Sequence, residues 1–70
     1  MKDNYTLYMD RILHAPAFGF VAGHEILYMV RYCALHDDTL TELQYNNIIR
    51  QCELAHIKMM EDNYNGMWNH

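Results

Sequence analysis

The sequence predicts a single all-α domain of three helices, and three observations support this prediction. Apolar residues recur at about 100° per residue in segments 4–14, 18–36 and 41–63. The dipeptide Ala15-Pro16 and the polar stretch 36–39 separate these segments. Hydrophobic residues make up 51% of the 70-residue chain, which is enough to form a core. Because short connectors make neighbouring helices antiparallel, we expect the second and third helices to form an antiparallel hairpin with the first packed across it.

The first helix is expected over about residues 4–14. Asp3 or Asn4 is the predicted N-cap, because either side chain accepts hydrogen bonds from the free backbone N–H groups of a helix start. The apolar residues fall in one arc of the helical wheel, as in an ordinary amphipathic helix, and Leu7 lies outside that arc. The predicted buried residues are Tyr5, Tyr8, Met9, Ile12 and Leu13.

The second helix is expected over about residues 18–36. Its start is open at this stage, because segment 15–23 fits either a turn followed by a helix or a short extended piece. Gly19 and Gly23 lie four residues apart, a spacing that allows the close approach of another helix and is also found in loops. From His24 onward the helix is apolar on most sides, which predicts a central position. The predicted buried residues are Ile26, Leu27, Met29, Val30, Cys33 and Ala34.

The third helix, over about residues 41–63, has the clearest start. Thr41 is the predicted N-cap, and Gln44 stands where its side chain can reach back to the cap and complete a capping box. Thr39 and Glu42 offer a second box two residues earlier. The helix start is therefore defined to within about two residues.

Apolar residues lie on two faces of this third helix. A helix that packs on one neighbour needs one apolar stripe, so the second face requires a cover of its own, either another helix of the chain or a second subunit. We expect Gly66 to end the helix and residues 64–70 to form a tail. The broad face comprises Tyr45, Ile48, Ile49, Cys52, Ala55, His56, Met59 and Met60, and the opposite face comprises Leu43, Leu54 and Ile57.

Small chains have small cores and often rely on oligomerisation, so we favour a homodimer. The tail holds Trp68, which either folds back on the core or acts as an exposed anchor in an interface. The candidate interaction surface is Tyr28, Tyr32 and Leu35 on the second helix, or Leu43, Leu54 and Ile57 on the third, together with Trp68.

Two cysteines and two histidines have spacings like those of a zinc site, namely Cys33, His36, Cys52 and His56. The hairpin argues against this site. If the turn centres near residue 39, Cys52 lies level with Ile26, and Cys33 is then about 10 Å away along the helix axis. The same separation argues against a disulfide between the two cysteines. We therefore expect no cofactor and two buried, reduced thiols.

Other chemical functions find little support in the sequence. The stretch from His24 to Tyr28 matches the HExxH zinc-protease motif except at Tyr28, where the second histidine would stand. The chain has no serine and no glycine-rich phosphate loop, and Asp37-Asp38 fits a solvated turn, so we predict no enzymatic activity. The net charge is −4 and the basic residues are scattered, which disfavours direct binding of nucleic acid. No apolar stretch is long enough for a membrane span, so we expect a soluble, cytoplasmic protein.

In its overall character the chain resembles the small helical accessory proteins of tailed phages and prophages, because it is short, acidic, free of serine, and rich in tyrosine, methionine and asparagine. This resemblance implies a protein that binds and redirects a host protein. The predicted function is therefore a non-enzymatic, homodimeric protein–protein interaction module. The alternatives are a small transcriptional regulator associated with nucleic acid and a zinc-binding protein.

Overall fold

The computed structural model describes the backbone of residues 3–68 and the side chains of residues 3–64. Within that range every regular element is helical, which confirms the all-α prediction. The elements in chain order are α1 (Asn4–His14), the short 3₁₀ helix η1 (Ala15–Phe18), α2 (Phe20–Leu35) and α3 (Glu42–Trp68).

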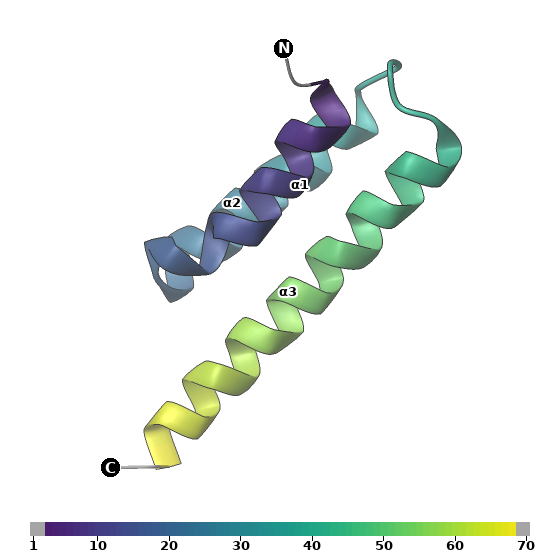
Figure 1. Ribbon diagram of the computed structural model, residues 1–70. Helices are drawn as coiled ribbons and strands as arrows, with labels where there is room; N and C mark the ends of the chain where they lie inside the picture. Colours follow the sequence, from purple (N-terminus) through teal and green to yellow (C-terminus); the bar gives the residue numbers. More distant parts are fainter. Residues whose placement is uncertain (1–2, 69–70) are drawn as a thin grey trace.

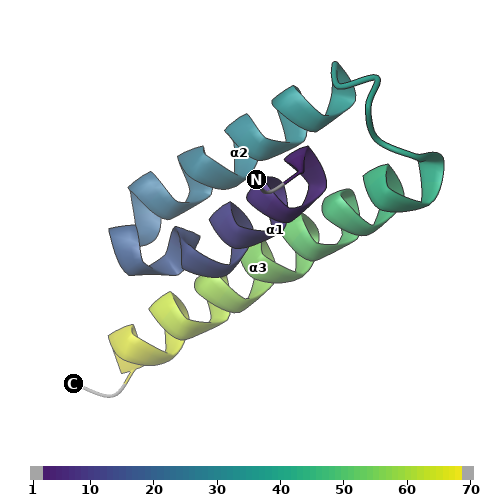
Figure 2. The same cartoon turned by 45° about the horizontal axis from the view of Figure 1, so that its top comes forward.

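The three α-helices pack side by side along the long axis of the molecule, which measures 46 × 21 × 15 Å. Leu27 of α2 meets Cys52 of α3, while His24, further back along α2, meets His56. At about 1.5 Å per residue, the 27 residues of α3 span about 40 Å and the 16 residues of α2 span about 24 Å. The last turns of α3 therefore extend beyond the start of α2 (Figures 1 and 2).

The predicted caps form at the starts of α1 and α3. The Asp3 carboxylate accepts a 2.8 Å hydrogen bond from the backbone N–H of Thr6, which lowers the pKa of Asp3. At α3, the Gln44 N–H donates to the Thr41 hydroxyl (3.1 Å) and the Thr41 N–H donates to the Gln44 side-chain oxygen (3.0 Å). This reciprocal pair of hydrogen bonds is the predicted capping box. The helix α3 begins at Glu42, directly after Thr41.

Segment 15–23, whose conformation the sequence left open, is helical except at Gly19. The 3₁₀ turn continues directly from α1, and Gly19 then reverses the chain with a φ of +96°, a value that favours glycine. The Gly19 N–H donates to the Pro16 carbonyl oxygen (3.2 Å). As a result α2 begins at Phe20, slightly later than the predicted residue 18.

At Gly23 the backbone of α2 lies close to both η1 and α3. A Cβ atom at this position would lie 2.4 Å from the Met59 Cε of α3 and 2.7 Å from the Ala15 carbonyl oxygen of η1. A Cβ at Gly19 would meet nothing within 4 Å. The two glycines therefore have different roles: Gly19 lies in a loop, and Gly23 lies in a tight helix crossing.

The core lies between the three helices and is small. Several residues that the helical wheel placed inside are exposed, namely Leu13, Met29, Cys33 and Met60. The predicted arcs were too broad because a helix in a three-helix bundle covers only part of each neighbour's surface. For the same reason α2 is not enclosed within the chain. The buried residues are Ile12, Ala15, Gly23, Leu27, Val30, Ala34, Ile48, Cys52 and Met59.

The prediction of a tail over residues 64–70 was wrong, because α3 continues through Gly66 to Trp68. A glycine inside a helix costs only about 1 kcal/mol relative to alanine, so it does not end a helix by itself. The side chain of Trp68 lies outside the described residues.

The connector between α2 and α3 is held by the Asp37 carboxylate. It accepts hydrogen bonds from the Tyr8 hydroxyl (2.7 Å) and the Asn4 side-chain amide (3.0 Å) of α1, and from the Thr39 backbone N–H (2.9 Å). The Thr39 hydroxyl also donates to this carboxylate (2.5 Å), and this bond, followed by the one from Tyr8, contributes most to lowering the pKa of Asp37 to about 2. The bond to Asp37 raises the pKa of Tyr8 to about 12. Asp37 is therefore a hub that ties α1 to the connector rather than part of a merely solvated turn.

Candidate interaction surface

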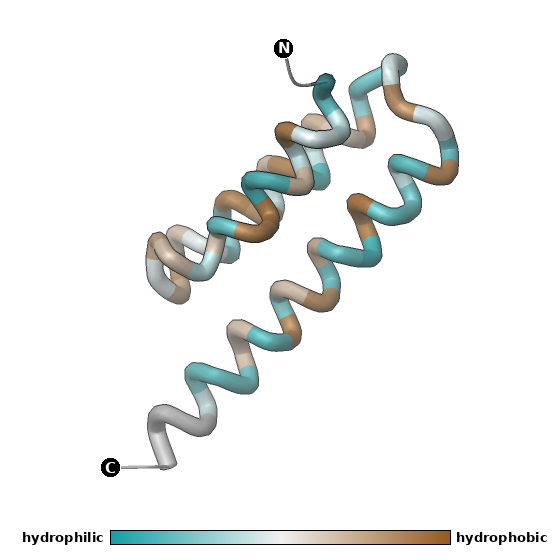
Figure 3. The backbone as a smooth tube through the Cα atoms, viewed as in Figure 1, coloured by the Kyte–Doolittle hydropathy of each residue, from teal (hydrophilic) through white to brown (hydrophobic). Residues whose placement is uncertain are grey.

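Among the exposed apolar side chains of the described residues, two groups coincide with the predicted interaction surface. On α2, Tyr28, Tyr32 and Leu35 are 61%, 67% and 62% exposed. We call these three residues, with Phe20, the aromatic face. The second group, the outer face of α3, consists of Leu43, Leu54 and Ile57, which are 80%, 50% and 53% exposed. The structure thus leaves exposed all six of the predicted interaction residues whose side chains it describes. Apolar segments recur along α3 in Figure 3.

Aromatic rings follow one another along α2 at intervals of four residues. Residues four apart on a helix lie on nearly the same side and contact each other. Here the Phe20 ring packs edge-on against His24, with ring centroids 4.5 Å apart, and the Tyr32 ring lies 4.7 Å from His36. The complete series is Phe20, His24, Tyr28, Tyr32 and His36. Three members of this ladder, Phe20, Tyr28 and Tyr32, belong to the aromatic face, and His24 and Tyr28 contact α3.

The centre of the ladder contacts α3 through a pair of histidines. His24 Nδ1 and His56 Nδ1 are 2.5 Å apart, and the two rings are parallel to within 6°. The Tyr28 ring packs on His56 at a centroid distance of 4.7 Å. Sequence reasoning missed this pair. Two signals could have revealed it. One was the four-residue spacing of rings on α2. The other was the predicted hairpin register, because a helix pair with Cys52 level with Ile26 has His56 within about two residues of His24.

The histidine pair is half-buried. The Nε2 atoms of His24 and His56 are both buried without a hydrogen-bond partner in the described part of the chain. Burial first, and then the charges of His24 and Arg31, lower the pKa of His56 from its usual 6.5. A neutral imidazole pair satisfies one Nδ1 with the other, because one nitrogen donates and the other accepts.

The structure separates the four candidate zinc ligands. His56 meets His24, His36 contacts Tyr32, and Cys33 is exposed, so the prediction of two buried thiols was wrong for Cys33. Cys52 is buried against the Leu27 carbonyl oxygen, 3.8 Å from its sulfur, and burial raises its pKa to about 11. Among the described residues no three histidine, cysteine or acidic side chains gather as a metal site requires.

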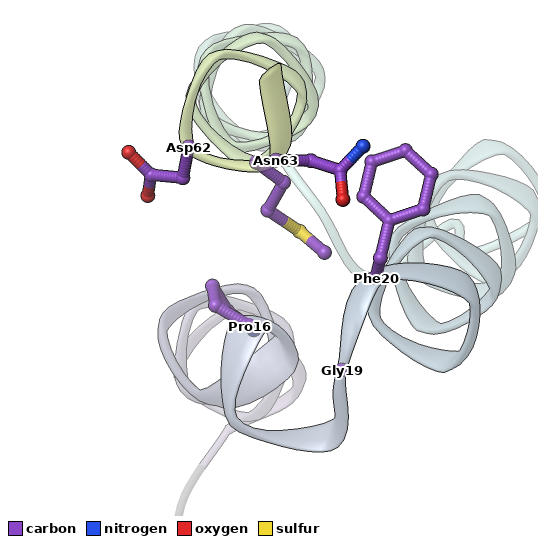
Figure 4. Close-up of a pocket in the computed structure, with 6 residues that line it drawn as sticks. Pro16, Gly19, Phe20, Asp62 and Asn63 are labelled. Atoms are coloured by element: carbon purple, nitrogen blue, oxygen red, sulfur yellow. The ribbon is translucent and has the colours of Figure 1, made fainter. Parts of the chain in front are cut away.

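Several hollows open on the surface of the described chain, and two of them border α3 near its C-terminal half. One, of about 250 Å³, lies where the Gly19 turn meets the far part of α3. Figure 4 shows Pro16 and Phe20 on either side of Gly19, both directed toward the turn of α3 that carries Asp62 and Asn63. The other, of about 410 Å³, is an apolar groove between α1 and α3 that reaches Leu54 on the outer face. The second hollow thus joins the core side of α3 to its outer face.

Comparison with known proteins adds no relative, since no family model, curated protein or solved structure matches the chain. Among the described residues, none of the helices combines the length and apolar character that a membrane span requires. The candidate surface is therefore interpreted from its own geometry.

Proposed function

We propose that the chain is a non-enzymatic helical protein–protein interaction module that self-associates into a homodimer through its aromatic face. In this proposal α2 and α3 form an antiparallel hairpin, and α1 packs across the side of the hairpin away from that face. The occupant of the aromatic face is a second copy of the chain.

The accessible surface area of the chain supports a second copy. The chain exposes 5436 Å², whereas a compact monomer of 8.4 kDa exposes about 4600 Å² by the usual scaling with mass. The excess of about 800 Å² matches the area that one partner contributes to a standard protein–protein interface. An excess of this size supports the dimer, and together with the exposure of Tyr28, Tyr32 and Leu35 it carries the proposal.

The aromatic face suits such an interface better than the outer face of α3. Tyrosine supplies a large, rigid contact area and keeps a polar tip that tolerates water, so a surface of this kind is stable in the free chain and in the dimer. The outer face of α3 is narrower, because Arg50, Asn47 and Glu61 lie among its apolar residues on the helical wheel. Since a two-fold dimer uses the same patch on both copies, Tyr28, Tyr32 and Leu35 would meet their own counterparts.

The outer face of α3 is then available for a different protein. The resemblance to phage and prophage accessory proteins leads us to propose a host protein as that second partner. Two separate apolar faces on a chain this small support one interface for assembly and one for a target.

The decisive experiment is the absolute mass by size-exclusion chromatography with light scattering over a range of concentrations. We expect twice the chain mass of 8.4 kDa for the unmodified protein. Tyr32→Glu should yield a folded monomer, because it places a charge in the centre of the interface and disturbs nothing buried. The matched control, Leu43→Glu on the outer face, should stay dimeric.

Two results would overturn the proposal in different ways. A monomer at every concentration for the unmodified chain would exclude self-association. A dimer that survives Tyr32→Glu but dissociates on Leu54→Asp would move the interface to the outer face of α3. Circular dichroism of each variant distinguishes a lost interface from a lost fold.

A further inference from the structure

The contact between His24 and His56 depends on the protonation of both rings. Their Nδ1 atoms face each other at 2.5 Å in nearly parallel rings whose centroids are 4.7 Å apart. At this distance one Nδ1 must carry a proton and the other must offer its lone pair. A second proton between the rings would set two N–H groups against each other and break the contact.

The surroundings of the pair do not accommodate an added charge. Phe20 covers the His24 ring edge-on at 4.5 Å, and Tyr28 covers the His56 ring at 4.7 Å. The Nε2 atoms of both histidines are buried and have no hydrogen-bond partner among the described residues. The neutral pair already holds one Nε2–H without an acceptor, and an added proton would place a full charge in the same apolar setting, which is more costly.

Among the charged groups near the pair, the one that acts on His56 from outside the pair opposes its protonation. Arg31 of α2 carries a positive charge that acts on His56. The carboxylates nearest in sequence, Glu25 on α2 and Glu53 on α3, both have exposed side chains, where water screens their charge. Tyr28 on α2 contacts His56 through its ring.

We propose that the pair of His24 and His56 is an acid-sensitive clasp, which holds α2 against α3 near neutral pH and releases this seam in mildly acidic solution. The clasp lies within one chain, so it does not depend on dimerisation. Its release would free Tyr28 from its contact with His56 and loosen the part of the aromatic face next to α3.

The direction of the pH dependence follows from the burial of the rings. The fold favours neutral His56, so the unfolded chain binds more protons than the folded chain below about pH 6.5. The stability that the clasp contributes is therefore complete above about pH 6.5 and declines as the pH falls below it.

The first test is a histidine-selective NMR titration of the complete, unmodified chain from pH 8 to pH 5. The exposed His14 and His36 serve as internal references. We expect His56 to bind its proton more weakly than either reference. Equal or tighter proton binding by His56 would overturn the proposal, and this measurement requires no variant to fold.

The second test compares melting temperatures at pH 7.5 and pH 5.5. Because unfolding takes up a proton at the lower pH, we expect a lower melting temperature at pH 5.5, by about 4–8 °C for each 1 kcal/mol of lost stability in a domain of this size. The double variant His24→Asn/His56→Asn keeps a side-chain amide near each Nδ1 position but does not titrate, so we expect it to lose most of this decrease.

The matched control for the double variant is His36→Asn, which removes an exposed ring of the same ladder. It should retain the full decrease in melting temperature. An undiminished decrease in the double variant would overturn the clasp. If the double variant does not fold, the NMR titration of the unmodified chain decides. Because both tests read out the fold and not the mass, a failed clasp and a failed dimer are distinguishable.

Discussion

Replacement of Gly23 by alanine sets two opposing effects against each other, and the structure predicts which one dominates. Inside a helix, alanine is favoured over glycine by up to about 1 kcal/mol. The new Cβ, however, would lie 2.4 Å from Met59 Cε and 2.7 Å from the Ala15 carbonyl oxygen. From helix propensity alone the variant would be more stable, and from packing it would be less stable.

The packing cost should be the larger effect. Met59 Cε is the end of a flexible side chain and can move, but the Ala15 oxygen belongs to the backbone of a buried residue. Restoring an ordinary contact of 3.4 Å requires that backbone to move by about 0.7 Å. Overpacking of this kind costs about 1–3 kcal/mol, and we take the upper half of that range because backbone must shift. The net expectation is a destabilisation by about 1–2 kcal/mol.

The assay is urea unfolding followed by circular dichroism, with Ala22→Gly as the matched control. Ala22 is the neighbouring position of α2 and is exposed, so its variant should lose up to about 1 kcal/mol through helix propensity alone. If Gly23→Ala were instead more stable than the unmodified chain, α2 could not approach η1 and α3 as closely as described. An unchanged urea slope would show that stability and not compactness had changed.

Three further perturbations test the core, the thiols and the connector. Leu27→Ala should cost about 2–5 kcal/mol by leaving a cavity, whereas Leu43→Ala should stay within about 0.5 kcal/mol because that side chain is 80% exposed; equal costs in urea unfolding would contradict the assigned core. A thiol reagent at neutral pH should modify the exposed Cys33 and spare the buried Cys52, whose pKa is raised to about 11, until the chain unfolds; mass spectrometry of the labelled chain would show equal labelling if this burial were wrong. Because the fold lowers the pKa of Asp37 from 3.8 to about 2, its carboxylate contributes stability above pH 3.8 that is lost as the pH falls toward 2; Asp37→Asn should weaken this part of the acid unfolding curve, and an unaltered curve would argue against the hub.

Helix existence and helix starts followed from the sequence because they depend on neighbouring residues. The Asp3 cap and the capping box of Thr41 and Gln44 involve partners three residues apart, so the pattern of residues contains all the information that they need. Neighbouring residues alone did not decide the conformation of residues 15–23. Pro16 and Gly19 are compatible with a turn or an extended piece, and the choice depends on what packs against Gly23.

The features that the sequence did not predict involve contacts between distant segments. Met29 and Met60 fall in apolar arcs of the wheel, yet both are exposed, because the width of an arc says nothing about how much of it a neighbour covers. Likewise the histidine pair joins positions 32 residues apart, and the Asp37 hub joins α1 to a connector 29–33 residues away. Such contacts require the register between helices, which was known only to within a residue or two.

The contacts that hold α1 also have a consequence for the order of folding events. Asn47 donates a 2.6 Å hydrogen bond to the Tyr5 hydroxyl across 42 positions of sequence, and Tyr8 reaches Asp37 across 29. These bonds reward folding only after long loops have closed, while the capping box of α3 forms between near neighbours. We therefore expect α1 to dock late, after the rate-limiting barrier. In stopped-flow kinetics Tyr8→Phe should then accelerate unfolding and leave the refolding rate nearly unchanged, whereas slower refolding would place the docking of α1 before the barrier.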